Sequence, residues 1–502
     1  MAKVENKHLQ ITKTDYLNFR FCRKNLWLEK NRPDEFRRMS MSEFELALLH
    51  EGQDVDTEAQ NLFPEGIVVR NPKKEDAIEK TAELLPLKKT LFQAAIFTEP
   101  YYIRADVLRW NDKIAGWEII EVKATTQVKT EKFNNHVYDL AFQYNVCRLA
   151  GLDIKKVSVT HLNSEYKKDG DIDYQKLFIT EDITKEVSEI HEKVASEMDI
   201  MISYLNGPEE KHCQCRIRTR SNHCTSFAYS NPDVPSYAVH DITRINAKKL
   251  TMLVDDGCLD ITSVPETLKL SEGQKLQVQT AQRGEPYIDE EKISAFLKSL
   301  EYPIYFIDYE SYLPAIPIFD RYGPYQNIVF QYSLHILEKP GGQLTHTDFL
   351  ATIPGHEPSG DLVEKMTKDI GKLGSIIVWH KPFEMGRNRE MAKLNPRFEK
   401  FLTEVNDRIV DLKEIFSQSM YVDAKFKGSA SIKKVLPVLV PELSYKNLEI
   451  NNGADANKQW GKMMSGELDQ DAKDEVVKNL LVYCKLDTFA MVKIFDFLQK
   501  FI

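Results

Sequence analysis

The sequence predicts a mixed α/β protein with more than one domain. Runs of β-branched and aromatic residues, which are typical of strands, alternate along the chain with segments whose apolar residues recur at helical spacing. The chain has 502 residues, more than the roughly 100 to 200 residues of one domain, and it shows no repeat of fixed period. We therefore expect a domain over residues 1–229, a helical linking region over 230–295 and a second domain over 296–502.

The composition excludes some broad classes of protein. With 42% hydrophobic residues, 28% charged residues and no apolar run of about 18 residues or more, the chain predicts neither a membrane span nor a disordered polymer. The first residues, MAKVENKHLQ, lack the apolar core of a secretory signal, so we expect a cytoplasmic location. The net charge of -9 does not exclude nucleic acid as a partner, because metal-dependent nucleases gather carboxylates and place basic residues locally.

The secondary structure expected along the chain follows from apolar spacing and turn signals. In the first region we expect helices over 11–30 and 133–151, the second ending on Gly151, and strands over 101–110 and 116–127. In the linking region, residues 242–266 have the pattern of two short helices joined at a glycine. In the last region we expect a strand over 302–312, an apolar strand ending in a polar turn over 375–391, and a closing helix over 476–501.

Three charged residues on two expected strands form a first candidate site. Asp106 lies on the earlier strand, and a spacing of two places Glu121 and Lys123 on one face of the later strand. Two carboxylates from neighbouring strands can hold Mg²⁺ or Mn²⁺, and a lysine beside them can orient the attacking water and offset charge on a phosphate. Taken alone, the same residues also fit a surface-exposed hairpin.

The order of these residues resembles that of the PD-(D/E)XK nucleases of the RecB type. As in that family, the acid and the acid-x-lysine strand are followed by a helix with a glutamine and an aromatic residue, here Gln143 and Tyr144. The resemblance implies a restriction-endonuclease-like α/β core that hydrolyses phosphodiester bonds and uses Gln143 as a further site residue. One element differs, since the family often carries a histidine shortly after a glycine in its first helical motif. Here Asp56 falls at that place and His50 precedes the glycine, so the histidine is not carried over.

A short stretch near the end of the first region is rich in residues that bind metals. It reads KHCQCRIRTRSNHC and contains Cys213, Cys215, Cys224, His212, His223, Arg216, Arg218 and Arg220. The seven cysteines of the chain are an odd number spread over a long sequence, which favours reduced thiols or metal ligands over a disulfide framework. A small zinc site with histidine ligands and inert thiols both fit the local pattern. The arginines fit a basic loop that contacts phosphate, and also a solvated charged loop.

Among the RecB-type nucleases, the chain is most similar to the CRISPR-associated iron-sulfur exonucleases. In those proteins one cysteine near the N-terminus and three after the nuclease core hold a cluster, and Cys22 matches the first of these. The resemblance therefore implies a 4Fe-4S cluster held by Cys22, Cys213, Cys215 and Cys224, with zinc as the alternative for four thiolates. Either metal centre would link the start of the domain to its end.

A second candidate site lies in the last region. Asp308 and Glu310 are two residues apart on an expected strand, so both carboxylates face the same side. Tyr483 and Asp487 are four residues apart on the closing helix and share a face. Carboxylates among apolar neighbours are costly to bury unless they are paired or bind a metal, whereas an edge strand would leave them in solvent.

These four residues resemble the DEDD exonucleases of the DnaQ type, in the variety that uses a tyrosine. The resemblance implies an RNase H-like α/β domain with a mixed sheet, in which carboxylates hold two metal ions, the tyrosine positions the water, and nucleotides are removed from 3′ ends. The family's middle motif is altered in HKPFE, where His380 replaces asparagine and Glu384 replaces aspartate. We expect Glu384 to bind metal, with Asp411 as a nearby alternative.

Over its whole length the chain resembles a family of bacterial proteins in which an exonuclease-like domain follows a RecB-like one. The expected function is that of a metal-dependent nuclease with two hydrolytic sites. It would use Mg²⁺ or Mn²⁺ and act on DNA more readily than on RNA, as an exonuclease in DNA repair or in defence against foreign nucleic acid. The alternative is a nucleic-acid-binding or scaffold protein in which one or both sites are silent.

Overall fold

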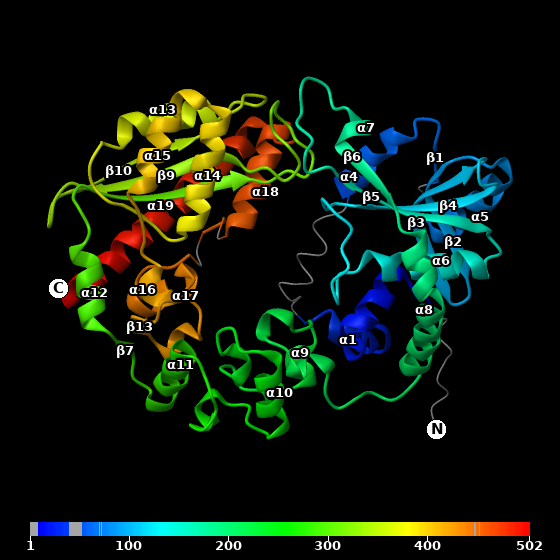
Figure 1. Cartoon of the computed structure of the whole chain (residues 1–502), viewed down its shortest axis with the longest axis horizontal. Helices are drawn as coiled ribbons and strands as arrows, with labels where there is room; N and C mark the ends of the chain where they lie inside the picture. Colours follow the sequence, from blue (N-terminus) through cyan, green and yellow to red (C-terminus); the bar gives the residue numbers. More distant parts are fainter. Residues whose placement is uncertain (1–8, 40–52, 70, 72, 446–447, 451) are drawn as a thin grey trace. The chain divides into compact units, whose positions relative to one another are not determined.

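The computed structural model describes residues 9–39, 53–69, 71, 73–445, 448–450 and 452–502, and they form two compact units (Figure 1). Unit 1 comprises Met1–Pro235, Ala247–Asp255 and Ala315–Pro324, and unit 2 comprises Ser236–Asn246, Asp256–Pro314 and Tyr325–Ile502. Both units combine helices with a sheet, which confirms the prediction of a mixed α/β protein. Within the described residues, no helix is both long enough and apolar enough to cross a membrane.

Unit 1 contains a six-stranded mixed sheet in which the strands follow their order in the sequence. The strands are β1 (Ile67–Val68), β2 (Leu91–Thr98), β3 (Tyr101–Asn111), β4 (Gly116–Lys123), β5 (Ile154–Leu162) and β6 (Phe178–Asp182). Neighbouring strands are antiparallel except for the parallel pairs β1/β2 and β4/β5. The two strands expected in this region are β3 and β4, although β4 ends at Lys123, earlier than expected.

Three helices of unit 1, α1 (Lys13–Asn31), α6 (His136–Leu149) and α8 (Thr184–Leu205), pack against one another, and α6 also packs on the sheet. Tyr16 of α1 stacks on Phe142 of α6 with ring centroids 5.2 Å apart. Gly151 follows α6 at a φ of 82°, which agrees with the expected helix end. The remaining helical segments are α2 (Pro33–Phe36), α4 (Gln53–Ala59), η1 (Gln60–Leu62), α5 (Lys74–Leu84), η2 (Leu85–Leu87), α7 (Tyr174–Leu177), η3 (Gln214–Ile217), η4 (Arg220–Asn222), α9 (Phe227–Ser230) and α10 (Ala247–Asp255).

Unit 2 contains a five-stranded mixed sheet of order β10-β9-β8-β11-β12. Its strands are β8 (Ile304–Tyr312), β9 (Ile328–Leu337), β10 (Leu344–Leu350), β11 (Ile376–Val378) and β12 (Ile409–Asp411), and a separate pair joins β7 (Tyr287–Ile288) to β13 (Tyr421–Val422). Strand β9 is antiparallel to both of its neighbours, β10 and β8, whereas β8, β11 and β12 run parallel to one another. The expected strand over 302–312 is β8.

The helices of unit 2 cover both faces of this sheet (Figure 1). Tyr305, Ile307 and Tyr309 of β8 share a core with residues of α13 (Ser359–Asp369), α14 (Lys381–Leu394) and α15 (Glu399–Asp407). The alternate residue Phe306 instead contacts Phe495 of α19 (Gln470–Leu498), with ring centroids 5.5 Å apart. Because successive side chains of a strand point to opposite faces, Asp308 and Glu310 lie on the face covered by α19. The remaining helical segments are η5 (Val239–Asp241), η6 (Ile261–Ser263), α11 (Glu272–Arg283), α12 (Glu290–Lys298), η7 (Pro396–Phe398), α16 (Glu414–Ser417), η8 (Ala424–Phe426), α17 (Ile432–Leu439), α18 (Gly453–Ser465) and η9 (Gln499–Phe501).

Two local expectations were only partly right, since the apolar strand forms as β11 and the first of the two short helices forms as α10. The expected polar turn after the apolar strand is the start of helix α14, which begins one residue after His380. Pro382 stands in the first turn of that helix, where its missing N–H costs nothing, so the proline that reads as a turn signal is compatible with a helix start. In residues 242–266, only α10 is an α-helix, and the segment beyond Gly257 forms the single 3-10 turn η6.

Candidate functional site

Glu121 lies at the centre of the first candidate site, in unit 1. It is on β4, and its side chain is 2% exposed. Its Oε1 accepts hydrogen bonds from Lys13 Nζ at 2.5 Å and from Lys123 Nζ at 2.8 Å, and its Oε2 accepts from Gln143 Nε2 at 2.7 Å. Lys123 also donates to Asp139 Oδ2 at 2.6 Å. Two lysines and a glutamine therefore fix the orientation of this carboxylate.

Asp106, on β3, is held at both of its oxygens. Its Oδ2 accepts from the backbone N–H of Val122 at 2.9 Å, and its Oδ1 accepts from Gln93 Nε2 at 3.2 Å. Gln93 also donates to Asp56 Oδ2 at 2.9 Å. The φ of Gln93 is 57°, a left-handed conformation that costs a residue other than glycine about 1–3 kcal/mol. In this conformation the amide of Gln93 reaches both Asp106 and Asp56.

The charges around these two carboxylates set their pKa values apart. Burial, followed by the charge of Glu121, raises the pKa of Asp106 to about 7. Burial also acts to raise the pKa of Glu121, but the ammonium groups of Lys123 and Lys13 outweigh it and hold this pKa well below its usual range. At neutral pH Glu121 is therefore ionised, while Asp106 lies near the midpoint of its titration.

The structure brings together the four residues predicted for this site, which are Asp106, Glu121, Lys123 and Gln143. Sequence reasoning missed Lys13 and Asp139. Asp139 precedes Gln143 by four residues on α6 and shares its face, so helical spacing could have revealed it. Lys13 is 108 residues from Glu121 and carries no local signal.

Three further residues stand at positions taken from the family pattern. Tyr144 turns to the edge of the His191 ring, with ring centroids 5.3 Å apart. Asp56, which occupies the place of the family's histidine, reaches the site through Gln93. His50 lies outside the described residues.

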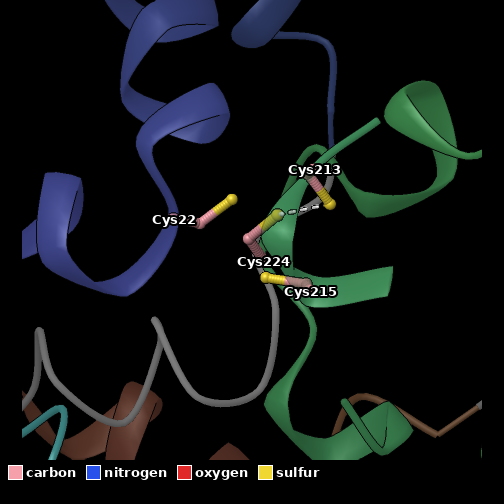
Figure 2. Close-up of side chains that lie close together, drawn as sticks. All are labelled: Cys22, Cys213, Cys215 and Cys224. Carbon is pink, nitrogen blue, oxygen red and sulfur yellow. Dashed lines mark hydrogen bonds between the residues drawn. The ribbon is translucent and has the colours of Figure 1, made fainter. Parts of the chain in front are cut away.

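The four cysteines expected to bind a metal meet in unit 1 (Figure 2). Cys22 comes from α1 and the other three come from the segment around η3 and η4, and all four Sγ atoms lie within 4.8 Å of one another. Each side chain is buried, at 3% exposure or less, and none of the seven cysteines forms a disulfide. Helix α1 is interrupted at Cys22, whose φ of -155° and ψ of 100° are not helical. This break turns the thiol of Cys22 toward the other three.

The residues around the sulfurs have defined contacts of their own. Asn231 Nδ2 donates to Cys213 Sγ at 3.2 Å, and Arg218 Nη1 donates to Cys215 Sγ at 3.5 Å. The ring of His223 stacks on Phe227, with centroids 3.3 Å apart. Among the described residues, the group of possible ligands contains the four sulfurs and no histidine nitrogen. A zinc site that uses the local histidines is therefore not what the structure forms.

Two arginines of the loop that was expected to contact phosphate have partners within the protein. Both terminal nitrogens of Arg216 donate to the carboxylate of Asp233, at 2.8 and 2.6 Å. Arg218 donates to the backbone oxygen of Phe21 at 2.7 Å and lies over the ring of Phe133, 4.3 Å from its centroid. The partners are an acid for Arg216, and a backbone oxygen and an aromatic ring for Arg218. A sequence pattern of basic residues does not reveal such partners.

The second candidate site lies in unit 2, between β8 and α19. A carboxylate oxygen of Asp308, one of Glu310 and the Sγ of Cys484 all lie within 4.8 Å of one another. Asp487 approaches from the same helix as Cys484, and its Oδ1 accepts a hydrogen bond from the hydroxyl of Tyr445 at 2.7 Å. The position of α19 on the sheet is fixed nearby, since Gln331 of β9 donates to the Leu480 oxygen at 2.9 Å. Three predicted carboxylates are thus gathered at one place.

Burial raises the pKa of each carboxylate of this second site, and neighbouring acids add to the rise for Asp308 and Glu310. Burial, followed by the charges of Asp487, Glu310 and Glu384, raises the pKa of Asp308 well above its ordinary range. Burial and the charge of Asp487 raise the pKa of Glu310 to about 8. Burial also raises the pKa of Asp487 to about 6. Ionising all of them without a cation is therefore unfavourable.

Two tyrosines and a lysine face Asp487. Hydrogen bonds from Tyr445 and Tyr483 and the charge of Lys433 oppose the rise in the pKa of Asp487 that burial causes. The Lys433 ammonium lies 5.6 Å from the ring centroid of Tyr445 and 5.7 Å from that of Tyr483. Tyr483, which was predicted, is 4% exposed. Tyr445 was missed, since it lies 42 residues before Asp487 in a region without a motif.

Glu384 and Asp411 were alternatives for the same metal ligand, and the structure separates them. Glu384 is 2% exposed in the first turn of α14, and burial raises its pKa to about 8. No described group donates a hydrogen bond to its Oε2. Asp411 instead accepts the backbone N–H groups of Lys381 and Lys413, both at 3.0 Å. Glu384 therefore has an oxygen available for a metal, while Asp411 holds backbone in place.

We expect the stability gained from added Mn²⁺ to increase with pH. An acid whose pKa is raised in the folded state destabilises the fold as the pH rises from its ordinary pKa through the raised one, here toward about 6 for Asp487 and about 8 for Glu310. A cation that binds the ionised carboxylates offsets this loss. Thermal unfolding from about pH 5 to about pH 9, with Mn²⁺ or with a chelator, measures the effect. An equal metal-induced shift at both ends of this range would contradict it.

The chain is similar to a family and to proteins whose descriptions name no activity. Residues 305–431 match a family described as "Domain of unknown function (DUF2779)". An uncharacterised protein of Ureaplasma parvum is 27% identical over 291 residues, which are 53% of this chain and 41% of that protein. An uncharacterised protein of Mycoplasma pneumoniae is 26% identical over 226 residues, 42% of this chain and 34% of that protein. The chain thus aligns with less than half of the length of these relatives. No solved structure matches.

Proposed function

We propose that the protein is a metal-dependent nuclease that hydrolyses phosphodiester bonds, with one site in each unit. The observation that carries the proposal is the carboxylate group of unit 2, in which Asp308, Glu310 and Asp487 converge from a strand and a helix and burial raises the pKa of each. Such a group is stabilised by divalent cations, whose preferred ligands are carboxylate oxygens. The residue order that resembles DEDD exonucleases supports hydrolysis from 3′ ends.

In unit 2 each side chain has a distinct part in the proposed reaction. Asp308, Glu310, Glu384 and Asp487 would hold the metal ions, and the hydroxyl of Tyr483 would orient the water. Bound Mg²⁺ or Mn²⁺ ions would activate that water and stabilise the leaving oxygen. Tyr445 holds Asp487 through its 2.7 Å hydrogen bond and so acts as a positioning residue.

In unit 1 the proposed ligands are Asp106 and Glu121. Gln143 fixes the orientation of the Glu121 carboxylate, and Lys123, held between Glu121 and Asp139, would offset the charge that develops on the phosphate. The strand order and the acid-x-lysine strand support a restriction-endonuclease-like fold for this unit, as the sheet between α13–α15 and α19 supports an RNase H-like fold for unit 2. The proposed substrate is DNA, with RNA as the second choice, and the proposed location is the cytoplasm.

The proposal is tested with the purified full chain and end-labelled single-stranded and duplex DNA and RNA. Wild type is compared with the double variant Glu121→Gln, Asp308→Asn, with Mg²⁺, with Mn²⁺ and with a chelator. We expect degradation that requires a metal ion and is lost in the double variant. If the wild type degrades no substrate above the level of the double variant, the protein is not a nuclease of this kind.

A second candidate function applies to unit 1, which would bind nucleic acid without cleaving it. The observation that favours it is the pairing of Glu121 with two lysines, which balances the carboxylate's charge without a metal ion. In that case Glu121→Gln alone leaves hydrolysis unchanged while Asp308→Asn alone removes it. Loss of part of the activity in Glu121→Gln would exclude a silent first site.

A further inference from the structure

We propose that the four cysteines of unit 1 bind a single tetrahedral metal ion, of which zinc is the expected one, and that they do not hold a four-iron cluster. This inference concerns Cys22, Cys213, Cys215 and Cys224 and is independent of the nuclease activity proposed above. It is carried by the distances between the sulfur atoms, by the residues that hold them, and by the chemistry of a four-thiolate donor set.

The sulfur atoms are spaced for a shared ion. A zinc–thiolate bond is about 2.3 Å long, so two thiolates on one tetrahedral ion stand about 3.8 Å apart and never more than about 4.6 Å. The Sγ atoms of Cys213 and Cys224 are 3.9 Å apart, and all four lie within 4.8 Å of one another. One ion at their centre thus reaches every sulfur with at most a small adjustment.

A four-iron cluster does not fit the same spacing. In such a cluster each thiolate binds a different iron atom, and the core of iron and sulfide lies between the thiolates. The sulfurs must then stand further apart than two bonds to one shared ion allow. Here the apolar side chains of Phe21 and Phe227, at 6% and 8% exposure, pack in one cluster with the thiols.

The donors around the sulfurs suit a buried anionic centre. Four thiolates leave a divalent ion with excess negative charge, which needs hydrogen bonds when it is buried. Asn231 donates to Cys213 at 3.2 Å, and Arg218 donates to Cys215 at 3.5 Å. The Arg218 side chain is itself fixed by its 2.7 Å bond to the Phe21 oxygen, so a positive charge stays beside the site.

The expected role of the ion is structural. Four protein ligands close the coordination sphere, which is typical of structural zinc. The ion would tie Cys22, in the break of α1, to a segment that begins 191 residues later with Cys213, and closing so long a loop favours the folded chain. Protein groups already join the same parts, since the Ser226 N–H donates to Asn25 Oδ1 at 2.9 Å and Trp27 Nε1 donates to the Gly207 oxygen at 3.0 Å.

The test is metal analysis of the full chain, produced with both iron and zinc in the medium and purified without oxygen. We expect a colourless protein with about one zinc per chain, no acid-labile sulfide, and the visible bands of tetrahedral thiolate-bound cobalt after Co²⁺ replaces the zinc. A brown protein with about four iron atoms and four sulfides per chain would overturn the inference, as would a protein that binds neither metal.

The variant Cys22→Ser should lose the zinc, while the matched variant Cys258→Ser, at a cysteine outside the group, should keep it. If Cys22→Ser does not fold, the wild-type protein can still show which cysteines bind the zinc. Stepwise modification of its thiols should release one zinc per chain as the four proposed ligands, Cys22, Cys213, Cys215 and Cys224, react, and the thermal midpoint should fall. Zinc that stays bound after all four have reacted would contradict the proposed ligands.

Discussion

Replacing Asp308 by asparagine should reduce hydrolysis by unit 2 about a hundredfold or more. The substitution keeps the shape of the side chain and removes one of the carboxylate charges that would hold the metal ions, and bound metal supplies several kcal/mol of transition-state stabilisation at about 1.4 kcal/mol per tenfold in rate. The measurement is the release of nucleotides from the 3′ ends of 5′-labelled single strands. It is made in the Glu121→Gln background, so that unit 1 does not contribute.

The same variant should be more stable than wild type in the absence of metal, although it is less active. Because the pKa of Asp308 is raised by burial and by neighbouring acids, removing its charge relieves repulsion, and the metal-free variant should unfold at a higher temperature than wild type at alkaline pH. It should also gain less stability from Mn²⁺. The control is Asp471→Asn, an exposed acid of α19, which should change neither the rate nor the stability. A variant that loses activity together with stability at alkaline pH would point to a structural role for Asp308.

Replacing Lys13 by methionine should tighten Mn²⁺ binding at the unit 1 site about ten- to a hundredfold. Lys13 Nζ is 2.5 Å from Glu121 Oε1, and its charge also acts on Asp106, so it occupies part of the space where a cation would bind these two carboxylates. A metal ion must displace this ammonium group. A hydrogen bond between charged groups contributes about 1.5–3 kcal/mol, and 1.4 kcal/mol is tenfold in affinity.

The measurement is a Mn²⁺ titration in the Asp308→Asn background, at a pH well above the pKa of about 7 of Asp106, so that protons do not compete for the site. Lys185→Met, at an exposed lysine of α8, is the matched control and should leave the affinity unchanged. Weaker binding in Lys13→Met would show that Lys13 supports the metal site. Faster hydrolysis at low Mn²⁺ concentration is the second expected sign of a displaced competitor.

Much of the local structure could be predicted because it depends on local patterns. The alternation of β4 and β8 placed Glu121 with Lys123 and Asp308 with Glu310, and the structure keeps both pairs on one face of their strands. The break in α1 at Cys22 left no such mark, since the segment keeps the apolar spacing of a continuous helix. A helical pattern reports which face is buried and does not report a single residue with a different backbone conformation.

The missed site residues share a physical cause. Lys13, Gln93 and Tyr445 reach their carboxylates through contacts between elements, over sequence separations that no periodic pattern spans. The same cause applies to Arg216 and Arg218 of the cysteine segment. Whether their charges are available to a ligand depends on acidic and aromatic partners, which the local pattern of basic residues does not show. The backbone conformation of Gln93 depends on the packed sheet and is likewise absent from the local sequence.

The division of the chain into units has a consequence for how the two halves can be separated. The chain passes from one unit to the other at 235/236, 246/247, 255/256, 314/315 and 324/325. A gene truncated after residue 235 would lose α10, which packs beside η3, and also Tyr322, whose oxygen accepts the Lys168 N–H at 3.0 Å. A single proteolytic cut at any of these five points would divide at least one unit between the two fragments. The two halves are therefore not exchangeable blocks of sequence, and recombination at a single breakpoint would damage unit 1.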